Sequence, residues 1–266
     1  MESYSDLYNH ASMRFYGSLN DFLPDKLKSR TLIYHYKENS NIKDAIESLG
    51  IPHPEIQLIL LNQEAVDFKH QIINQDRISV YPFFNTLNIS NMVLANPVSF
   101  NELIFILDVH LGKLAKYLRF AGFDCLLLPG LSDQEIVNIG ARDNRIILTR
   151  DIGMLKHKKV KFGYWLRSQD PTEQFKEVIL HFRIRNSDLF PWQRCGICNG
   201  MISPVDKQKV YDTLEEGTRI HYNDFHQCQD CGHVYWKGNH FEKMEQRLRL
   251  IMSNTSKELN QNKTMQ

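Results

Sequence analysis

Residues 105–151 read FILDVHLGKLAKYLRFAGFDCLLLPGLSDQEIVNIGARDNRIILTRD, and this stretch decides the fold of the middle of the chain. It alternates short apolar runs, which predict strands, with segments whose apolar residues recur at helical spacing. Strands are expected at residues 103–108, 123–128 and 145–150, with helices between them. A further short helix, a strand and a last helix are expected over residues 152–182. Nearly continuous apolar strands that alternate with helices indicate a parallel α/β sheet covered on both faces.

Two aspartates follow strands of this predicted sheet. Asp108 ends the strand at residues 103–108, and Asp151 comes directly after the strand at residues 145–150. Parallel strands point their carboxyl ends to one edge of a sheet, so both side chains are expected at that edge. Asp133, at the start of the helix after the second strand, can reach the same edge. Neighbouring carboxylates repel each other unless a cation lies between them, and Mg²⁺ and Mn²⁺ prefer oxygen ligands. The sequence therefore predicts a Mg²⁺ or Mn²⁺ site at these three aspartates.

Each aspartate also has an alternative interpretation, which for Asp133 and Asp151 is purely structural. Ser132 and Glu135 have the spacing of a capping box, in which case Asp133 only complements the helix dipole. Asp151 can likewise cap the short helix that follows it. An Asp-x-Asp phosphatase nucleophile is a competing interpretation of the first aspartate, but His110 occupies the place of the second carboxylate.

The basic side chains gather in the middle third of the chain. Residues 103–191 carry 14 Lys and Arg against 10 Asp and Glu, whereas the whole chain has a formal net charge of only +1. Three basic residues lie off the apolar stripe of the first predicted helix, and two arginines follow later strands. These side chains can line the approach to the aspartates and contact phosphates: Lys113, Lys116, Arg119, Arg150 and Arg167. A solvated face is the alternative interpretation, as it is for the basic run at residues 156–161.

Two Cys-x-x-Cys pairs lie near the C-terminus, and each is followed by a small residue or a glycine. They consist of Cys195, Cys198, Cys228 and Cys231. Two such turns supply the four thiolates of a tetrahedral zinc site of the closed, structural kind, which has no position for a reactive water. His226 and His233 are the obvious substitute ligands, but with four cysteines present they are expected to be surface or core histidines. Cys125 stands alone in an apolar strand and is expected to be buried and inert.

The first 84 residues predict a small mixed domain. Strands are expected around residues 13–16, 31–36, 58–61 and 78–81, with a helix at residues 42–49 that Ser40 or Asn41 can cap and Gly50 can end. The order ββαββ resembles the ubiquitin-like β-grasp fold of sulfur carriers. Those carriers end in a free Gly-Gly, whereas this chain runs on through Phe83 and Phe84. Docking or scaffolding is therefore the expected role of this domain.

Bulk composition is that of an ordinary globular protein, with 42% hydrophobic and 24% charged residues among 266. No apolar run approaches the ~18 residues that a membrane span needs. The sequence shows no secretory signal, and paired cysteines in such a chain favour metal binding over disulfides. A cytoplasmic location with no membrane partner is expected.

Three parts of the sequence together resemble the Mut7-C RNase domain family. They are the quoted stretch, the later WLRSQDPTEQ, and the segment from RCGICNG to CQDCGHVYWKGNHFEKM. The front domain resembles the Mut7-C ubiquitin-like domain. The resemblance implies a PIN-like nuclease fold with a C-terminal zinc ribbon, in which Asp108, Asp133 and Asp151 are the acidic positions. Arg119, Thr149 and Arg150 match its flanking motif.

The implied function is a metal-dependent ribonuclease whose zinc ribbon aids RNA binding, with Trp236 or Tyr235 stacking on a base. A protein partner for the ubiquitin-like domain is also expected. Two alternatives stay open: a non-catalytic RNA-binding adaptor, and a ubiquitin-like interaction module on an RNase-derived scaffold. The chain is predicted to divide into a β-grasp domain at residues 1–84, a linker at 85–102, a PIN-like domain at 103–190, a ribbon at 191–245 and a tail at 246–266. The tail is expected to be helical or disordered, with disorder after about Asn254.

Overall fold

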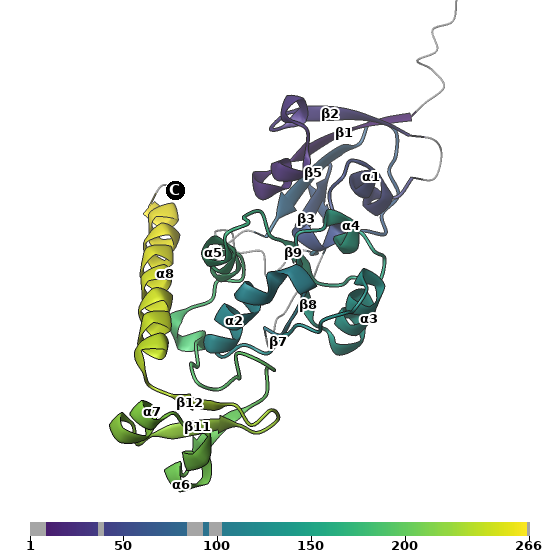
Figure 1. Ribbon diagram of the computed structural model, residues 1–266. Coiled ribbons are helices and arrows are strands. Elements are labelled where there is room, and N and C mark those ends of the chain that lie inside the picture. The colour runs from purple at the N-terminus through teal and green to yellow at the C-terminus, as the bar shows by residue number, and fades with distance from the viewer. Residues whose placement is uncertain (1–8, 37–39, 84–92, 96–102, 265–266) are drawn as a thin grey trace, which may run out of the picture. The chain divides into compact units, whose positions relative to one another are not determined.

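The fold is known from a computed structural model (Figure 1), which describes residues 9–36, 40–83, 93–95 and 103–264. The chain divides into two compact units. The first consists of Met1–Asn101 and Asp151–Trp165, and the second of Glu102–Arg150 and Leu166–Gln266. Most of the predicted linker at residues 85–102 lies outside the described residues.

The first unit contains a five-stranded mixed sheet. Its strands are β1 (Asn9–Phe15), β2 (Thr31–Tyr36), β3 (Ile56–Leu61), β4 (Glu64–Val66) and β5 (Arg77–Pro82), in the order β2-β1-β5-β3-β4. β1 and β5 are parallel, and the other pairs are antiparallel. This arrangement, with α1 (Ile42–Ser48) between β2 and β3 in sequence, is the predicted β-grasp fold.

Local sequence explains the ends of these elements. Asn41 caps α1, because its side-chain oxygen accepts the backbone N–H of Asp44. Asn62 and Gln63 both have positive φ, at 49° and 78°, as a tight hairpin between β3 and β4 requires. The apolar side chains of α1, Ile42, Ala45 and Ile46, are buried in the core of the sheet.

The segment Asp151–Trp165 is built into this first unit. It contains α4 (Ile152–Leu155) and β9 (Gly163–Trp165), and it packs on the 3₁₀ turn His53–Glu55. The carboxylate of Glu55, which is 1% exposed, accepts the backbone N–H of Trp165 at 2.6 Å. His53 Nε2 lies 2.7 Å from the carbonyl oxygen of Val160. The residues after Asp151 are therefore held by side chains of the β-grasp domain.

Glu55→Ala should destabilise the first unit by roughly 1–3 kcal/mol, because it leaves the half-buried N–H group of Trp165 without this acceptor. Denaturant unfolding measures the change. Glu64→Ala is the matched control, since Glu64 is exposed on β4 and should leave the midpoint unchanged. Equal midpoints for wild type and Glu55→Ala would show that the contact contributes nothing.

The second unit contains three parallel strands in the order β7-β6-β8. They are β6 (Phe105–Leu107), β7 (Cys125–Leu126) and β8 (Ile146–Thr149), with Phe105 opposite both Cys125 and Ile146. Each is shorter than its predicted range, but the parallel α/β arrangement is confirmed. The helices α2 (Gly112–Phe120), α3 (Asp133–Asp143) and α5 (Pro171–His181) belong to the same unit. β6 and β8 are buried along their whole lengths, as strands covered on both faces must be.

A three-stranded antiparallel sheet follows in this unit. It consists of β10 (Ile202–Val205), β11 (Phe225–Cys228) and β12 (Val234–Trp236). The chain between β10 and β11 forms the short helices α6 (Lys207–Val210) and α7 (Glu216–His221). The buried core of this sheet is small and consists of Val210, Leu214 and Phe225.

The C-terminal segment forms one helix, α8 (Asn239–Thr264), so of the two states predicted for the tail, helical or disordered, the structure has the helix as far as Thr264. Leu248, Ile251, Met252 and Thr255 are buried at helical spacing, and α8 packs against α5. The residues after Asn254 contain no aromatic side chain, and this composition had suggested disorder there. In the described part of the chain, no helix is both long enough and apolar enough to span a bilayer.

Candidate metal and nuclease sites

The four predicted cysteines lie together in the ribbon. One potential ligand atom from each lies within 4.8 Å of the others. Among the described residues, no other group of three or more His, Cys, Asp or Glu side chains comes this close together. Cys195 Sγ lies 3.7 Å from Cys231 Sγ, and Cys198 Sγ lies 3.4 Å from Cys228 Sγ. A tetrahedral site with metal–sulfur bonds of about 2.3 Å has sulfur–sulfur edges of about 3.8 Å, so the cluster fits such an ion.

The residues after each pair shape the turns around the sulfurs. Asn199 has a φ of 75° and Gly232 a φ of 74°, the left-handed conformation that reverses the chain. The N–H of Gly200 points to Cys198 Sγ at 3.4 Å. A Cβ atom at Gly200 would lie 2.9 Å from Cys228 Sγ, so only glycine fits where the two turns meet.

Tyr235 supports the first thiolate from the side. Its hydroxyl donates to Cys195 Sγ at 3.0 Å and accepts the N–H of Gly196 at 3.1 Å. Burial raises the pKa of Cys195, but the Tyr235 hydroxyl and the backbone N–H groups of Ile197 and Cys198 lower it more, to about 7. These donors stabilise the thiolate of Cys195, which is the form of cysteine that binds a metal ion.

His226 and His233 are not part of the cluster. The ring of His226 packs against Trp192, and the exposed His233 packs edge-on against Tyr235. Cys125 is fully buried, and burial raises its pKa to about 12, so it is an unreactive thiol as predicted.

The first cysteine turn is anchored to the strand β7. Asn199 Oδ1 accepts the N–H of Cys125 at 2.9 Å, and Asn199 Nδ2 donates to Asp124 at 2.8 Å. Asp124 also forms a two-pronged ion pair with Arg145, at 2.7 and 3.2 Å. The ribbon is therefore joined to the parallel sheet by buried and half-buried polar contacts rather than by apolar packing alone.

Asp124→Asn should lower stability by about 2 kcal/mol at neutral pH, because it removes a charged acceptor from Arg145. Burial raises the pKa of Asp124, but Arg145 and Asn199 lower it more, so the net shift is downward from 3.8. A depressed pKa contributes stability that is present above pH 3.8 and is lost as the pH falls through the lower, folded value. Unfolding at pH 6 and pH 2.5 should therefore show a gap between wild type and variant that closes at the acid end. A gap that persists unchanged at pH 2.5 contradicts this assignment.

Arg119 is the residue whose predicted role the structure changes. It is 4% exposed, and its guanidinium donates to the carbonyl oxygens of Cys125, Gly196 and Ile197. These bonds hold the tip of the first cysteine turn against β7 and leave the side chain buried. The prediction that Arg119 contacts RNA phosphates is therefore replaced by a structural role, which its place on a helix with the exposed Lys113 and Lys116 had hidden.

Asp108 lies at the carboxyl end of β6, as predicted. It is half-buried, and its Oδ2 accepts the hydroxyl of Thr149, at the end of the neighbouring strand β8, at 3.3 Å. Its Oδ1 accepts the N–H of His110 at 3.2 Å and caps the 3₁₀ turn Val109–Leu111. The sheet register, with Leu107 opposite Leu148, thus brings the ends of two neighbouring strands together at this carboxylate.

The other two aspartates are exposed. Asp133 is the first residue of α3, where Ser132 and Glu135 form the predicted capping box. Asp151 is the N-cap of α4, and its Oδ1 accepts the N–H of Gly153 at 2.7 Å. Asp108 and Asp133 belong to the second unit and Asp151 to the first. A joint site of the three carboxylates therefore remains a prediction.

The remaining predicted RNA-binding residues differ in exposure. Lys113 and Lys116 are exposed on α2. Arg150 is exposed and donates to the carbonyl oxygen of Ser168 at 2.8 Å. Arg167 is half-buried beside Glu177, whose carboxylate accepts its backbone N–H.

Two protein families match the chain. The Mut7-C RNAse domain matches residues 104–248, and Mut7-C ubiquitin matches residues 8–88. No curated protein and no solved structure gives a significant match. The first match spans more than half of the chain and includes the four cysteines and the three aspartates, and the second covers the β-grasp domain. The chain therefore belongs to the Mut7-C RNAse domain family and carries a Mut7-C ubiquitin domain before it in the sequence.

Proposed function

We propose that this protein is a metal-dependent ribonuclease that hydrolyses RNA phosphodiester bonds. The observation that carries the proposal is the carboxylate of Asp108, which the Thr149 hydroxyl holds at the carboxyl end of β6 in a chain of the Mut7-C RNAse domain family. Ligand and catalytic groups of open α/β sheets lie at this end of the strands.

Asp108, Asp133 and Asp151 would hold one or two Mg²⁺ or Mn²⁺ ions. All three offer carboxylate oxygens, the ligands that such hard cations prefer, and each is at least partly exposed. When bound, such an ion lowers the pKa of a water molecule and stabilises charge on the phosphate. Thr149 orients the Asp108 carboxylate by its hydrogen bond, and the exposed Lys116 is placed to attract the phosphates of the substrate.

The four cysteines would hold Zn²⁺ as a structural ion. The sulfur–sulfur distances fit it, and all four ligands come from the protein, so the site is closed. The zinc would hold the ribbon together and present it to RNA. It takes no part in cleavage.

A single assay tests the proposal. Purified protein is incubated with end-labelled single-stranded RNA, with Mn²⁺ or Mg²⁺ added or omitted, and the resident zinc is left in place. Cleavage that appears only with the added metal supports a ribonuclease. RNA binding without cleavage under every metal overturns it and favours the adaptor.

The adaptor is the second candidate, and a specific observation favours it. Asp108 and Asp151 each accept a backbone N–H two residues ahead, so both have structural work as caps in a protein without catalysis. In that case the ribbon and the exposed lysines of α2 would bind RNA, and the ubiquitin-like domain would recruit a protein partner.

Contacts inside the first unit suggest a further role for the ubiquitin-like domain. Its buried turn His53–Glu55 holds the segment that begins at Asp151. We infer that the domain fixes the backbone that carries this carboxylate, in addition to any protein partner that it binds.

A further inference from the structure

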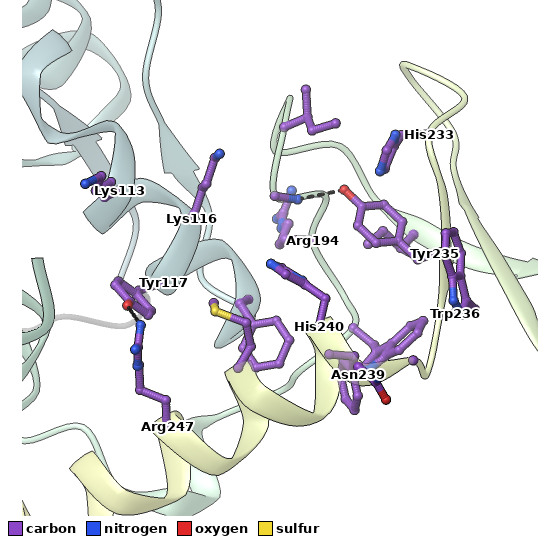
Figure 2. A pocket seen from close by; sticks show the side chains of 18 of the residues that line it. Lys113, Lys116, Tyr117, Arg194, His233, Tyr235, Trp236, Asn239, His240 and Arg247 are labelled. Atoms are coloured by element: carbon purple, nitrogen blue, oxygen red, sulfur yellow. Dashed lines mark hydrogen bonds between the residues drawn. The ribbon is translucent and has the colours of Figure 1, made fainter. Parts of the chain in front are cut away.

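A large pocket lies in the second unit between α2, the ribbon and the start of α8 (Figure 2). Its volume is about 920 Å³, near the upper end of the ~300–1,000 Å³ of ligand pockets. That is far more than a metal ion or an inorganic phosphate fills. The aspartates proposed for catalysis do not line it.

The charges around the pocket are unbalanced. Four Lys and Arg side chains line it, Lys113, Lys116, Arg194 and Arg247, against one carboxylate, Asp170. The carboxylate of Asp170 already accepts the N–H groups of Thr172 and Glu173 and caps α5. The pocket is therefore suited to an anionic ligand.

The two lysines are the cations available to such a ligand. Arg247 donates to the hydroxyl of Tyr117 at 2.6 Å and so joins α8 to α2, and Arg194 bonds to the carbonyl of Asn199 and faces Asp124. Lys113 and Lys116 are exposed, and among the described residues neither makes an ion pair. Figure 2 shows Lys116 projecting from α2, and His240 at the start of α8, among the residues that line the pocket.

Aromatic rings supply the other walls. On one side Trp192 and Phe241 pack with their centroids 4.7 Å apart, and Phe120 packs on Phe241 at 5.4 Å. On the ribbon side Tyr235 and Trp236 line the pocket. Figure 2 shows that the rings of the ribbon face the helices α2 and α8 across the opening.

Cations at the rim and rings in the walls are the features that bind single-stranded nucleic acid. Each base stacks on an aromatic ring, and the backbone follows the positive charges. A paired base hides both of its faces in the duplex, so such a pocket accepts unpaired bases only. We propose that this pocket binds a single-stranded segment of RNA, with unpaired bases against the rings and phosphates at Lys113 and Lys116. The proposal rests on RNA being the substrate in the function proposed above, and it adds where and in what form the RNA is held.

The test measures binding separately from cleavage. The full chain with Asp108→Asn and its resident zinc, in buffer without Mg²⁺ or Mn²⁺, is titrated with a fluorescently labelled 12-nucleotide single-stranded RNA. Lys113→Ala/Lys116→Ala should weaken binding at least about 10-fold. It should also reduce the slope of log affinity against log salt by about 1.4, or about 0.7 for each lost phosphate contact.

Lys158→Ala/Lys159→Ala is the matched control, because it removes two exposed charges from the basic run in the other unit. It should leave the affinity within about twofold if the pocket, rather than net charge, holds the RNA. Equal losses in both double variants overturn the proposal.

Two further readouts test the walls of the pocket. Trp192 and Trp236 are two of the three tryptophans of the chain, so bound RNA should quench tryptophan fluorescence, and Trp165→Phe should keep the quenching.

Double-stranded RNA and a poly-glutamate peptide of equal charge should bind at least about 10-fold more weakly than the single strand. Tighter binding of either, or no quenching by the single strand, contradicts the proposal. Because cleavage is not measured, an inactive aspartate site cannot produce these failures, and a negative result here leaves metal-dependent cleavage untouched.

Discussion

Asp108→Asn is expected to reduce Mn²⁺-dependent RNA cleavage by roughly 100-fold or more. Asparagine keeps the shape of the side chain and can still accept the Thr149 hydroxyl, which now bonds to Asp108 at 3.3 Å. It removes the negative charge, and with it most of the attraction for a divalent ion. Loss of a group that stabilises charge in a transition state has effects of about 10²–10³. Initial cleavage rates over a range of Mn²⁺ concentrations measure the change.

Asp151→Asn should have a similar effect. Asp133, the third carboxylate, is either a metal ligand or a residue that only complements the dipole of α3, and its substitution separates these two interpretations. If Asp133 is a metal ligand, Asp133→Asn loses cleavage as well. If it only complements the dipole of α3, the variant loses a few tenths of a kcal/mol of stability and keeps its activity. Asp143→Asn, at the end of the same helix, is the control, because Asp143 pairs with Arg142 and has no proposed role in cleavage. Full activity in both Asp108→Asn and Asp151→Asn would remove the proposed active site.

Cys228→Ser is expected to release the structural ion and unfold the ribbon while the parallel sheet stays folded. The ribbon has only a small apolar core of its own, in which the buried residues are Val210, Leu214 and Phe225. Zinc binding by such small domains contributes about 10 kcal/mol or more of apparent free energy. The parallel sheet has its own core, which includes Phe105, Leu148 and Phe175.

Hydrogen exchange followed by mass spectrometry distinguishes the two parts. Amides in residues 195–236 should exchange at least about 100-fold faster in the variant, whereas β6 and β8 should keep their protection. Cys125→Ala is the control, since Cys125 is buried outside the cluster and the variant should keep one bound zinc. A ribbon that stays protected without metal contradicts the structural role of the ion. Loss of protection in β6 as well would show that the contacts of Arg119 and Asn199 make the two parts one cooperative unit.

Features set by neighbouring residues were predictable from the sequence. The capping box at Ser132 and the cap at Asn41 follow from short-range chemistry, and both are present. The apolar runs of β6 and β8 predicted a parallel sheet because burial on both faces leaves a continuous pattern. The cysteine cluster was predictable because metal ligands have fixed spacing.

Features that depend on distant partners were not predictable. Arg119 has the sequence context of a solvated helix residue, and only the carbonyls of Gly196 and Ile197, some 77 positions away, explain its burial. The carboxylate of Glu55 is buried where it accepts the backbone N–H of Trp165, a partner far along the chain. The packing of α8 against α5 joins segments that are far apart in the sequence, and it was not predicted. The pocket was not predicted as a cavity, since its walls come from three segments.

Crystals of the zinc-loaded protein soaked with Mn²⁺ and measured at the manganese and zinc absorption edges test the central claim most directly. The proposed function predicts zinc at Cys195, Cys198, Cys228 and Cys231 and a separate manganese peak bound by the carboxylates of Asp108 and Asp151. Manganese that binds elsewhere, or carboxylates of Asp108 and Asp151 too far apart to share an ion, would contradict it.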